Sequence, residues 1–379
     1  MLKSVAVVLT DRCNAACSHC GSPSARGTGT EHNPQSLKSL FLQFSGMGVR
    51  DILLSGGEPL LHPALMDIVS DLEPTGMRCA LLTNGTLLKE KHIRTLSRFT
   101  HISFVRLSAE YPERILRKRE WQGRYHPTGK VFETLRMISG HGVTAGVNVT
   151  LFPDNLRFAG ELARSAAADG AAFIRFSPVL PGGNAATMQL HAGFHEECLR
   201  TVLRIHGNCG KNRGGRSRTA DASDMFMMSS TLCSSCRGGT DTVTIGADGR
   251  AHICPMFDLG GKSVNVYKEG IGESLKVLAR RRNYLQRKLT GSNSGEACSG
   301  CPHAFTCRGG CLAEWMIRGR GGQQAVCRLQ QWRKLSEQGF SADEQTAITQ
   351  VEKLYREILS AGGSVSCVRA HPVWTVLLK

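Results

Sequence analysis

The sequence predicts an α/β fold built on a parallel sheet, and two observations support this prediction. Short apolar runs typical of buried strands recur through the first two hundred residues, and amphipathic helical patterns separate them. The strand candidates are residues 5–9, 51–55, 79–83, 102–107, 143–151 and 173–177. Six strand–helix units therefore follow one another, and right-handed crossovers would make their strands parallel.

The helical patterns between these strands carry start signals as well as periodicity. Asn33 and Pro34 are typical of an N-cap and a first helical residue, and apolar residues follow at helical spacing at Leu37, Leu40, Phe41 and Phe44. Further helical patterns cover residues 63–72, 89–98, 130–140 and 156–169. Active-site groups of such repeats gather where the strands end, so polar residues there are the first candidates for function.

Composition sets limits on the class of protein. The chain has 379 residues, which is long enough for more than one structural unit. Hydrophobic residues make up 41%, which is typical of soluble globular proteins. We expect a cytoplasmic location without a membrane partner, because no apolar stretch is long enough to span a bilayer and the start lacks a signal peptide. A net charge of +16 fits an acidic or phosphorylated partner, or only a solvated basic surface. Aromatic residues are only 6%, and without a stacking motif nucleic acid is not favoured.

Three cysteines follow the first strand at C-x3-C-x2-C spacing, namely Cys13, Cys17 and Cys20. Fifteen cysteines in a chain expected in the cytoplasm indicate metal ligation rather than disulfides. Three thiolates hold three corners of a cubane iron–sulfur cluster and leave the fourth iron open. A zinc site or a redox pair is the alternative interpretation of this spacing alone.

A second motif, Gly56-Gly57-Glu58-Pro59, follows the second strand. Together the two motifs resemble those of the radical S-adenosylmethionine (radical SAM) enzymes, although His19 stands where the family often has an aromatic residue. The resemblance implies a partial (β/α)6 TIM-type barrel and a [4Fe-4S] cluster whose open iron is chelated by the amino and carboxylate groups of SAM. It also implies that Gly56, Gly57, Glu58 and Pro59 bind the SAM amino group.

Residues at the ends of later strands fit the same resemblance. Thr83-Asn84-Gly85 closes the third strand as it often does in this family, and Ser108-Ala109-Glu110 stands where relatives commonly carry Ser-Leu-Asp-Gly. Polar residues at strand ends are also often loop anchors. The SAM contacts implied by the resemblance are Asn84 and Ser108, with Asn148, Thr150 and Arg175 as weaker candidates.

A second group of cysteines begins at Cys233, and residues 242–254 in it are typical of a β-hairpin that ends in Cys254. This group resembles the SPASM domain, an extension that binds two auxiliary [4Fe-4S] clusters. The resemblance implies a first cluster on Cys236, Cys254 and Cys311, with Cys233 as the candidate fourth ligand. It implies a second cluster on Cys298, Cys301, Cys307 and Cys327, and a zinc ribbon is the alternative for Cys298 to Cys311.

These patterns predict four segments. Residues 1–206 form the barrel, 207–232 a basic glycine-rich linker, 233–335 the SPASM domain, and 336–379 a C-terminal helix with an extended tail. Four cysteines stay unassigned. Cys79 and Cys198 are expected in the core, whereas Cys209 and Cys367 are candidate hydrogen-atom donors for which incidental structural roles are the commoner outcome.

The resemblance implies an enzyme that cleaves SAM reductively to a 5′-deoxyadenosyl radical, which abstracts hydrogen from a substrate carbon. Many relatives modify ribosomally synthesised peptides by crosslink, thioether formation or dehydrogenation, and this is the expected activity. The expected partners are a peptide, a flavodoxin- or ferredoxin-type electron donor and a separate leader-binding protein. The alternatives are a small-molecule epimerase or dehydrogenase acting on a sugar or aminoglycoside, or a protein-maturing enzyme of the sulfatase-activating type.

Overall fold

The structure is a computed structural model, and it describes the chain with gaps. The described residues are 2–21, 29–116, 130–180, 182–191, 193–211, 238–254, 263–290, 338–342, 344–346, 349 and 375–377. Within them the strands form one sheet of nine strands in the order β8-β7-β1-β2-β3-β4-β5-β6-β9. The predicted linker from residue 212 onward and most of the predicted SPASM domain lie outside the described residues.

Six strands pair in chain order and all run parallel, which confirms the predicted α/β fold. They are β1 (Ser4–Val8), β2 (Asp51–Ser55), β3 (Arg78–Thr83), β4 (Ile102–Ser108), β5 (Ala145–Leu151) and β6 (Phe173–Pro178). Because these six strands all run in the same direction, their carboxyl ends all lie along one edge of the sheet.

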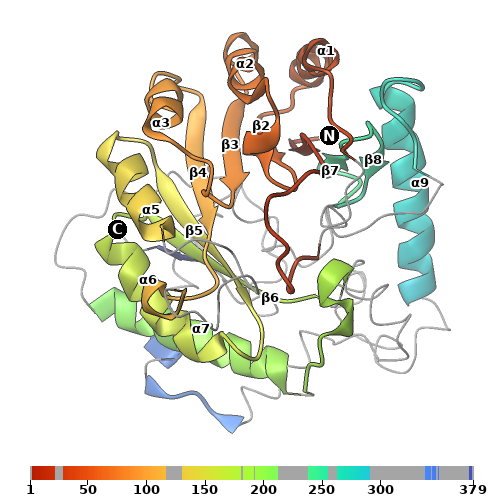
Figure 1. The fold of residues 1–379 in the computed structure, drawn as a ribbon. Coiled ribbons are helices and arrows are strands. Elements are labelled where there is room, and N and C mark those ends of the chain that lie inside the picture. Colours follow the sequence, from red (N-terminus) through yellow and green to blue (C-terminus); the bar gives the residue numbers. More distant parts are fainter. Residues whose placement is uncertain are drawn as a thin grey trace.

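Helices follow the strands and cover one face of the sheet (Figure 1). They are α1 (Pro34–Gly46), α2 (Leu65–Ser70), α3 (Glu90–Leu96), α4 (Glu113–Leu116), α5 (Val131–Gly140), α6 (Ala159–Ala168) and α7 (Phe194–Lys211), with short 3-10 turns such as η2 (Pro59–Leu61), η3 (Glu73–Thr75), η5 (Leu156–Phe158) and η6 (Gly183–Thr187). The start of α1 is as predicted, because the Asn33 side chain accepts a hydrogen bond from the Ser36 amide and Pro34 occupies the first turn. The end of α7 differs from the sequence prediction, since the first five residues of the expected linker, 207–211, are helical.

Two additions extend the sheet beyond the six repeats. The predicted hairpin is formed by β7 (Thr242–Ile245) and β8 (Ala251–His252), and β7 pairs parallel with β1. At the other edge β9 (Thr375–Leu377) pairs antiparallel with β6, and α9 (Ile271–Thr290) follows the hairpin. The hairpin that carries Cys254 is therefore part of the same sheet as the first cysteine loop.

The face of the sheet opposite the helices is called here the inner face. Successive side chains of each strand point alternately to the inner face and to the helix-covered face. Its base is a small apolar cluster of Ala80, Phe104 and Phe173, separate from the large core under the helices. The rings of Phe104 and Phe173 meet edge to face, with centroids 5.3 Å apart. Gly146 on β5 lies against the Phe173 ring, where a Cβ would clash, so only glycine leaves room for that ring.

Among the described residues no helix combines the length and apolar character that crossing a membrane requires.

Candidate functional site

The loops after β1 and β2 lie side by side because the pairing of these strands continues beyond their ends. The Leu9 amide donates to the Ser55 carbonyl, the Gly57 amide to the Thr10 carbonyl and the Glu58 amide to the Arg12 carbonyl, each at 2.8 Å. The cysteine loop and the Gly56–Pro59 loop, predicted as separate motifs, are thereby held together at the carboxyl edge of the sheet.

The close approach of the two loops requires glycine. A Cβ on Gly57 would overlap the Arg12 carbonyl and lie 2.9 Å from the Cys13 Cβ. A Cβ on Gly56 would lie 2.9 Å from the Thr10 carbonyl oxygen. Real Cβ atoms do not pack at these separations against backbone, so the glycine pair allows the second loop to reach the first cysteine.

Glu58 ties its loop to the end of β3. Its carboxylate accepts hydrogen bonds from the Thr83 hydroxyl at 2.6 Å, the Asn84 amide at 2.8 Å and the Leu60 amide at 3.1 Å. Burial raises the pKa of the Glu58 carboxyl, and these hydrogen bonds oppose that rise. The predicted segment therefore divides, because Gly56 and Gly57 line the site whereas Glu58 and Pro59 are not among its lining residues.

The cysteine loop is held by a third strand end as well. The Asn84 side-chain amide donates to the Asn14 side-chain oxygen at 2.8 Å, and the Asn14 side-chain amide donates to the Thr86 hydroxyl at 2.7 Å. Asn14 lies between the first two cysteines of the motif, so the predicted Asn84 positions the cysteine loop directly.

A contact that the sequence analysis missed comes from η6, the turn after β6. The Asn184 side chain donates to the Cys17 carbonyl at 3.0 Å, and its backbone amide donates to the Cys20 carbonyl at 2.9 Å. Gly183 approaches the same carbonyl with a positive φ of 57°, and a Cβ there would lie 2.6 Å from the Cys20 oxygen. The Pro-Gly-Gly-Asn sequence that leads into η6 was the available signal, but it is also an ordinary turn sequence.

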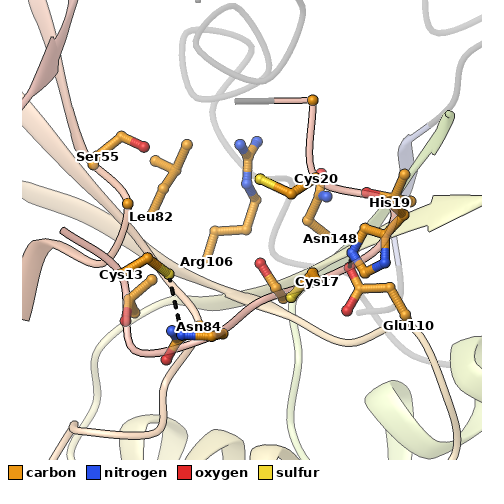
Figure 2. A pocket seen from close by; sticks show the side chains of 17 residues that line it. Cys13, Cys17, His19, Cys20, Ser55, Leu82, Asn84, Arg106, Glu110 and Asn148 are labelled. Atoms are coloured by element: carbon orange, nitrogen blue, oxygen red, sulfur yellow. Dashed lines mark hydrogen bonds and ion pairs between the residues drawn. The ribbon is translucent and has the colours of Figure 1, made fainter. Parts of the chain in front are cut away.

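These loops enclose one cavity of about 280 Å³ (Figure 2). All three cysteines line it, together with polar groups from the ends of the strands. Of the predicted SAM contacts, the cavity brings together Gly56, Gly57, Asn84, Ser108, Asn148 and Thr150. Arg175 lies on β6 beside Asn148 in register but is not among the lining residues.

The three cysteines suit a metal cluster chemically. Burial is the main cause that raises the pKa of Cys13 and of Cys17, which reaches about 12, and neighbouring Glu110 and the other thiols add to the effect at Cys17. Such thiols are protonated at neutral pH until a metal displaces the protons. In the described part of the chain no three Cys, His, Asp or Glu side chains converge on a single ion. A cubane instead takes each thiolate at a different iron, so this donor set fits it.

His19 occupies the position where an aromatic residue was expected, and it stacks like one. Its ring lies 5.1 Å from that of Phe152 at an interplanar angle of 12°. Its Nε2 lies 3.4 Å from the Glu110 carboxylate, and both side chains are buried. His19 therefore packs into the wall of the cavity between Cys17 and Cys20.

The other predicted cysteines divide between described and undescribed parts of the chain. Cys79 and Cys198 are buried as predicted, and burial raises the pKa of both thiols. Cys254 follows β8 and is half-buried. Cys209 lies in α7 with its side chain outside the described set. The remaining candidates lie outside the described residues, namely Cys233, Cys236, Cys298, Cys301, Cys307, Cys311, Cys327 and Cys367.

Comparison with known families gives a match for the first part of the chain. Residues 7–164 match the model of the Radical SAM superfamily. The chain is 34% identical over 90 residues to the probable GTP 3',8-cyclase of Methanothermobacter marburgensis, a match that covers 24% of this chain and only 30% of that protein.

Two other relatives match over most of their length. The AdoMet-dependent heme synthase of Nitratidesulfovibrio vulgaris is 22% identical over 332 residues, covering 82% of this chain and 87% of that protein. The mycofactocin maturase MftC of Mycolicibacterium smegmatis is 25% identical over 327 residues, covering 82% and 78% respectively.

Solved structures share the fold. Streptococcus suis SuiB bound to its precursor peptide SuiA superposes with a TM-score of 0.59 at 12% identity, covering 83% of this chain and 70% of that one. Native anSMEcpe with bound AdoMet and the Cp18Cys peptide gives a TM-score of 0.64 at 15% identity, covering 95% and 100%. At these identities the likeness concerns the architecture alone.

Proposed function

We propose that this protein, whose residues 7–164 match the Radical SAM superfamily, cleaves S-adenosylmethionine reductively and uses the radical to modify a ribosomally synthesised peptide. The observation that supports this proposal most directly is the cavity at the carboxyl edge of the sheet. It combines Cys13, Cys17 and Cys20 with the paired glycines and with polar groups from three further strand ends.

The three cysteines would hold the [4Fe-4S] cluster. When bound there, the cluster supplies the electron that splits SAM into methionine and a 5′-deoxyadenosyl radical. The rest of the work belongs to the chain. Gly56 and Gly57 line the cavity beside Cys13, and without side chains they leave room for a polar ligand to approach the backbone there.

Polar side chains on β4 and β5 and directly after β3 would orient the rest of SAM. Asn84, Ser108, Asn148 and Thr150 line the cavity from consecutive strands, and together they offer both donors and acceptors to an amino acid and a ribose. Glu58 acts in this scheme as a positioning residue, through Thr83 and Asn84. A contact from Arg175 to SAM stays a prediction. The apolar base of the inner face would limit water near the radical.

The choice of a peptide as substrate rests on the relatives. One is named a maturase, and a solved structure of the same fold was determined with its precursor peptide. The heme synthase is a relative whose name refers to a small molecule, and it supports a small-molecule substrate as the second candidate. Auxiliary clusters on the later cysteines, an electron donor of the flavodoxin or ferredoxin type, a leader-binding partner and a cytoplasmic location belong to the proposal as well.

Mass spectrometry of a co-expressed peptide tests this proposal. A short peptide encoded beside the gene would be produced with the wild-type enzyme or with the Cys13→Ala, Cys17→Ala, Cys20→Ala variant. A crosslink, thioether or dehydrogenation gives a loss of two hydrogens with the wild type alone. If the peptide keeps its mass but yields a D-amino acid after hydrolysis, the reaction is an epimerisation and not an oxidation. A peptide without any modification would count against peptide maturation.

A further inference from the structure

The cavity contains a buried positive charge that the SAM-binding scheme does not use. Arg106 lies on β4, two residues before Ser108 on the same face, and it lines the cavity although its exposed fraction is only 8%. Its Nη1 is buried without a hydrogen-bond partner, and in the described part of the chain the side chain makes no ion pair. Figure 2 shows the guanidinium among the pocket residues.

A second arginine lies nearby with the same sign of charge. Arg175 on β6 pairs with Asn148 on β5, whereas Arg106 on β4 pairs with Gly146, two residues earlier on β5. The Nε of Arg175 is also buried without a partner among the described atoms. Burial lowers the pKa of Arg106, and the nearby charge of Arg175 lowers it further by a smaller amount. The neighbouring positive charge of Arg175 therefore adds to the cost of burying Arg106.

Other arginines in this fold show what a resident counter-ion looks like. Arg114 pairs with Glu161, Arg136 with Asp169 and Arg78 with the buried Asp51, each at 2.6 Å. Among the described residues that line the cavity, the one carboxylate belongs to Glu110, which lies 3.4 Å from His19. A buried guanidinium without a partner is unfavourable, so the fold retains Arg106 at a cost in stability.

Arg106 lies at a different position along the strand direction from the predicted SAM contacts. In register it lies beside Leu82 and Gly146, directly above the Phe104–Phe173 base. Ser108 and Asn148 lie two residues further along their strands, toward the cysteines, which corresponds to roughly 6–7 Å. A ligand group that meets Arg106 therefore lies deeper on the inner face than the groups at the cysteine edge.

We propose that Arg106, with Arg175 beside it, binds a carboxylate of the substrate at the base of the cavity. This inference rests on the proposed function and narrows its substrate, since a peptide can offer a C-terminal carboxylate or an Asp or Glu side chain. A planar guanidinium matches a carboxylate through two parallel hydrogen bonds. Glu110 on the same cavity wall disfavours a phosphate dianion, which carries more negative charge.

A binding experiment with a defined probe tests the carboxylate site. The full chain, reconstituted anaerobically and loaded with SAM, would be titrated with N-acetyl-alanyl-alanine and with its C-terminal amide. The acid binds at least tenfold more tightly than the amide, and Arg106→Gln removes that preference. Arg94→Gln, which alters an exposed helix pair with Glu90, keeps it. Equal affinity for acid and amide, no binding of the acid, or a preference that survives in Arg106→Gln would overturn the proposal.

Two further arms separate the sources of the anion. A parallel SAM titration decides whether the methionyl carboxylate of SAM is the ligand. A tenfold loss of SAM affinity in Arg106→Gln, with acid binding intact, would assign the arginine to SAM and overturn the substrate assignment. Inorganic phosphate that displaces the acid at lower concentration than acetate would also overturn the choice of a carboxylate.

The stability of the ligand-free chain gives an independent readout. Arg106→Met replaces an unpaired buried charge by an apolar side chain of similar length, so the proposal predicts a higher melting temperature. A lower one would indicate a structural role for the arginine. SAM cleavage by the wild type without any probe is measured separately. Cleavage without acid binding contradicts only the carboxylate site, and acid binding without cleavage contradicts only the proposed function.

Discussion

Gly57 shows at the scale of one residue why the second motif must be glycine-rich. Its Cα faces the Arg12 carbonyl and the Cys13 Cβ, and the Gly57 amide is bonded to Thr10. The contact is between backbones, so no side-chain rotation can relieve a larger residue. The motif thus acts first through packing, and the Gly57 amide serves the pairing of the two loops.

We predict that Gly57→Ala separates the two loops. The added methyl group lowers the free energy of unfolding by about 1–3 kcal/mol through overpacking and reduces the iron bound per chain. Gly160→Ala in α6 is the matched control, because its Cβ would meet only the flexible end of Arg164, at 3.6 Å. Iron analysis and urea unfolding measure both effects, and wild-type iron content in Gly57→Ala would contradict the packing argument.

His32 is the second residue whose environment predicts a measurable effect. It is almost fully buried, and its Nδ1 lies 2.8 Å from the Tyr267 hydroxyl. Burial, assisted by the nearby His62, lowers the pKa of His32 to about 4. The neutral imidazole thus joins the segment after β8 to the loop before α1.

We predict that this histidine makes the fold less stable in mild acid. Between pH 6.5 and 4 the unfolded chain binds a proton that the folded His32 excludes, so stability falls as pH falls through that window. The loss from His32 is about 2 kcal/mol between pH 7 and pH 5. His32→Gln should lack this component, and the difference between the two proteins in urea unfolding at both pH values isolates it. Equal pH slopes would refute the assignment.

At the scale of elements, the cysteine loop is held by turns from three other strands. The Gly56–Pro59 loop after β2 contacts its start, the Asn84 segment after β3 contacts Asn14, and η6 after β6 contacts Cys17 and Cys20. The loop therefore spans from the start of the repeat series to its end. A parallel sheet makes this arrangement available, since all the contacting turns leave the same edge.

Asn184→Ala tests the η6 contact. It removes the hydrogen bond to the Cys17 carbonyl, worth about 1 kcal/mol, and we expect iron to be lost to a chelator roughly fivefold faster. Asn33→Ala removes the N-cap bond of α1 at a similar cost in stability and is the matched control, because that bond joins Asn33 to Ser36 and not to a cysteine. If both variants release iron at the same rate, the η6 contact has no specific role.

The elements were largely predictable, and the long-range contacts were not. Strand alternation and the Asn33–Pro34 start signal are local, so the six repeats and α1 follow from the sequence. The pairing of β7 with β1 and the contact of Asn184 join residues far apart in the chain, which periodicity does not report. The sequence analysis missed Arg106 because a charged residue inside a strand normally indicates a side chain that faces solvent.

At the scale of the whole molecule, the sheet brings the hairpin that ends in Cys254 beside the strand that leads into the first cysteine loop. If both predicted auxiliary clusters form as cubanes, anaerobic reconstitution yields about twelve irons per chain. Iron and sulfide analysis with protein quantification by amino-acid analysis measures this number, and a stable value near four would contradict the two-cluster prediction.

The central claim is that the cavity at Cys13, Cys17 and Cys20 is a SAM-cleaving centre. The most direct test is 5′-deoxyadenosine formation by the reconstituted full-length enzyme with SAM and a strong reductant, compared with the Cys13→Ala, Cys17→Ala, Cys20→Ala variant. The wild type forms 5′-deoxyadenosine and methionine, whereas the variant retains iron on its later cysteines and forms neither. Cleavage that persists in the variant, or a reduced and iron-loaded wild type that forms no 5′-deoxyadenosine, would contradict the claim.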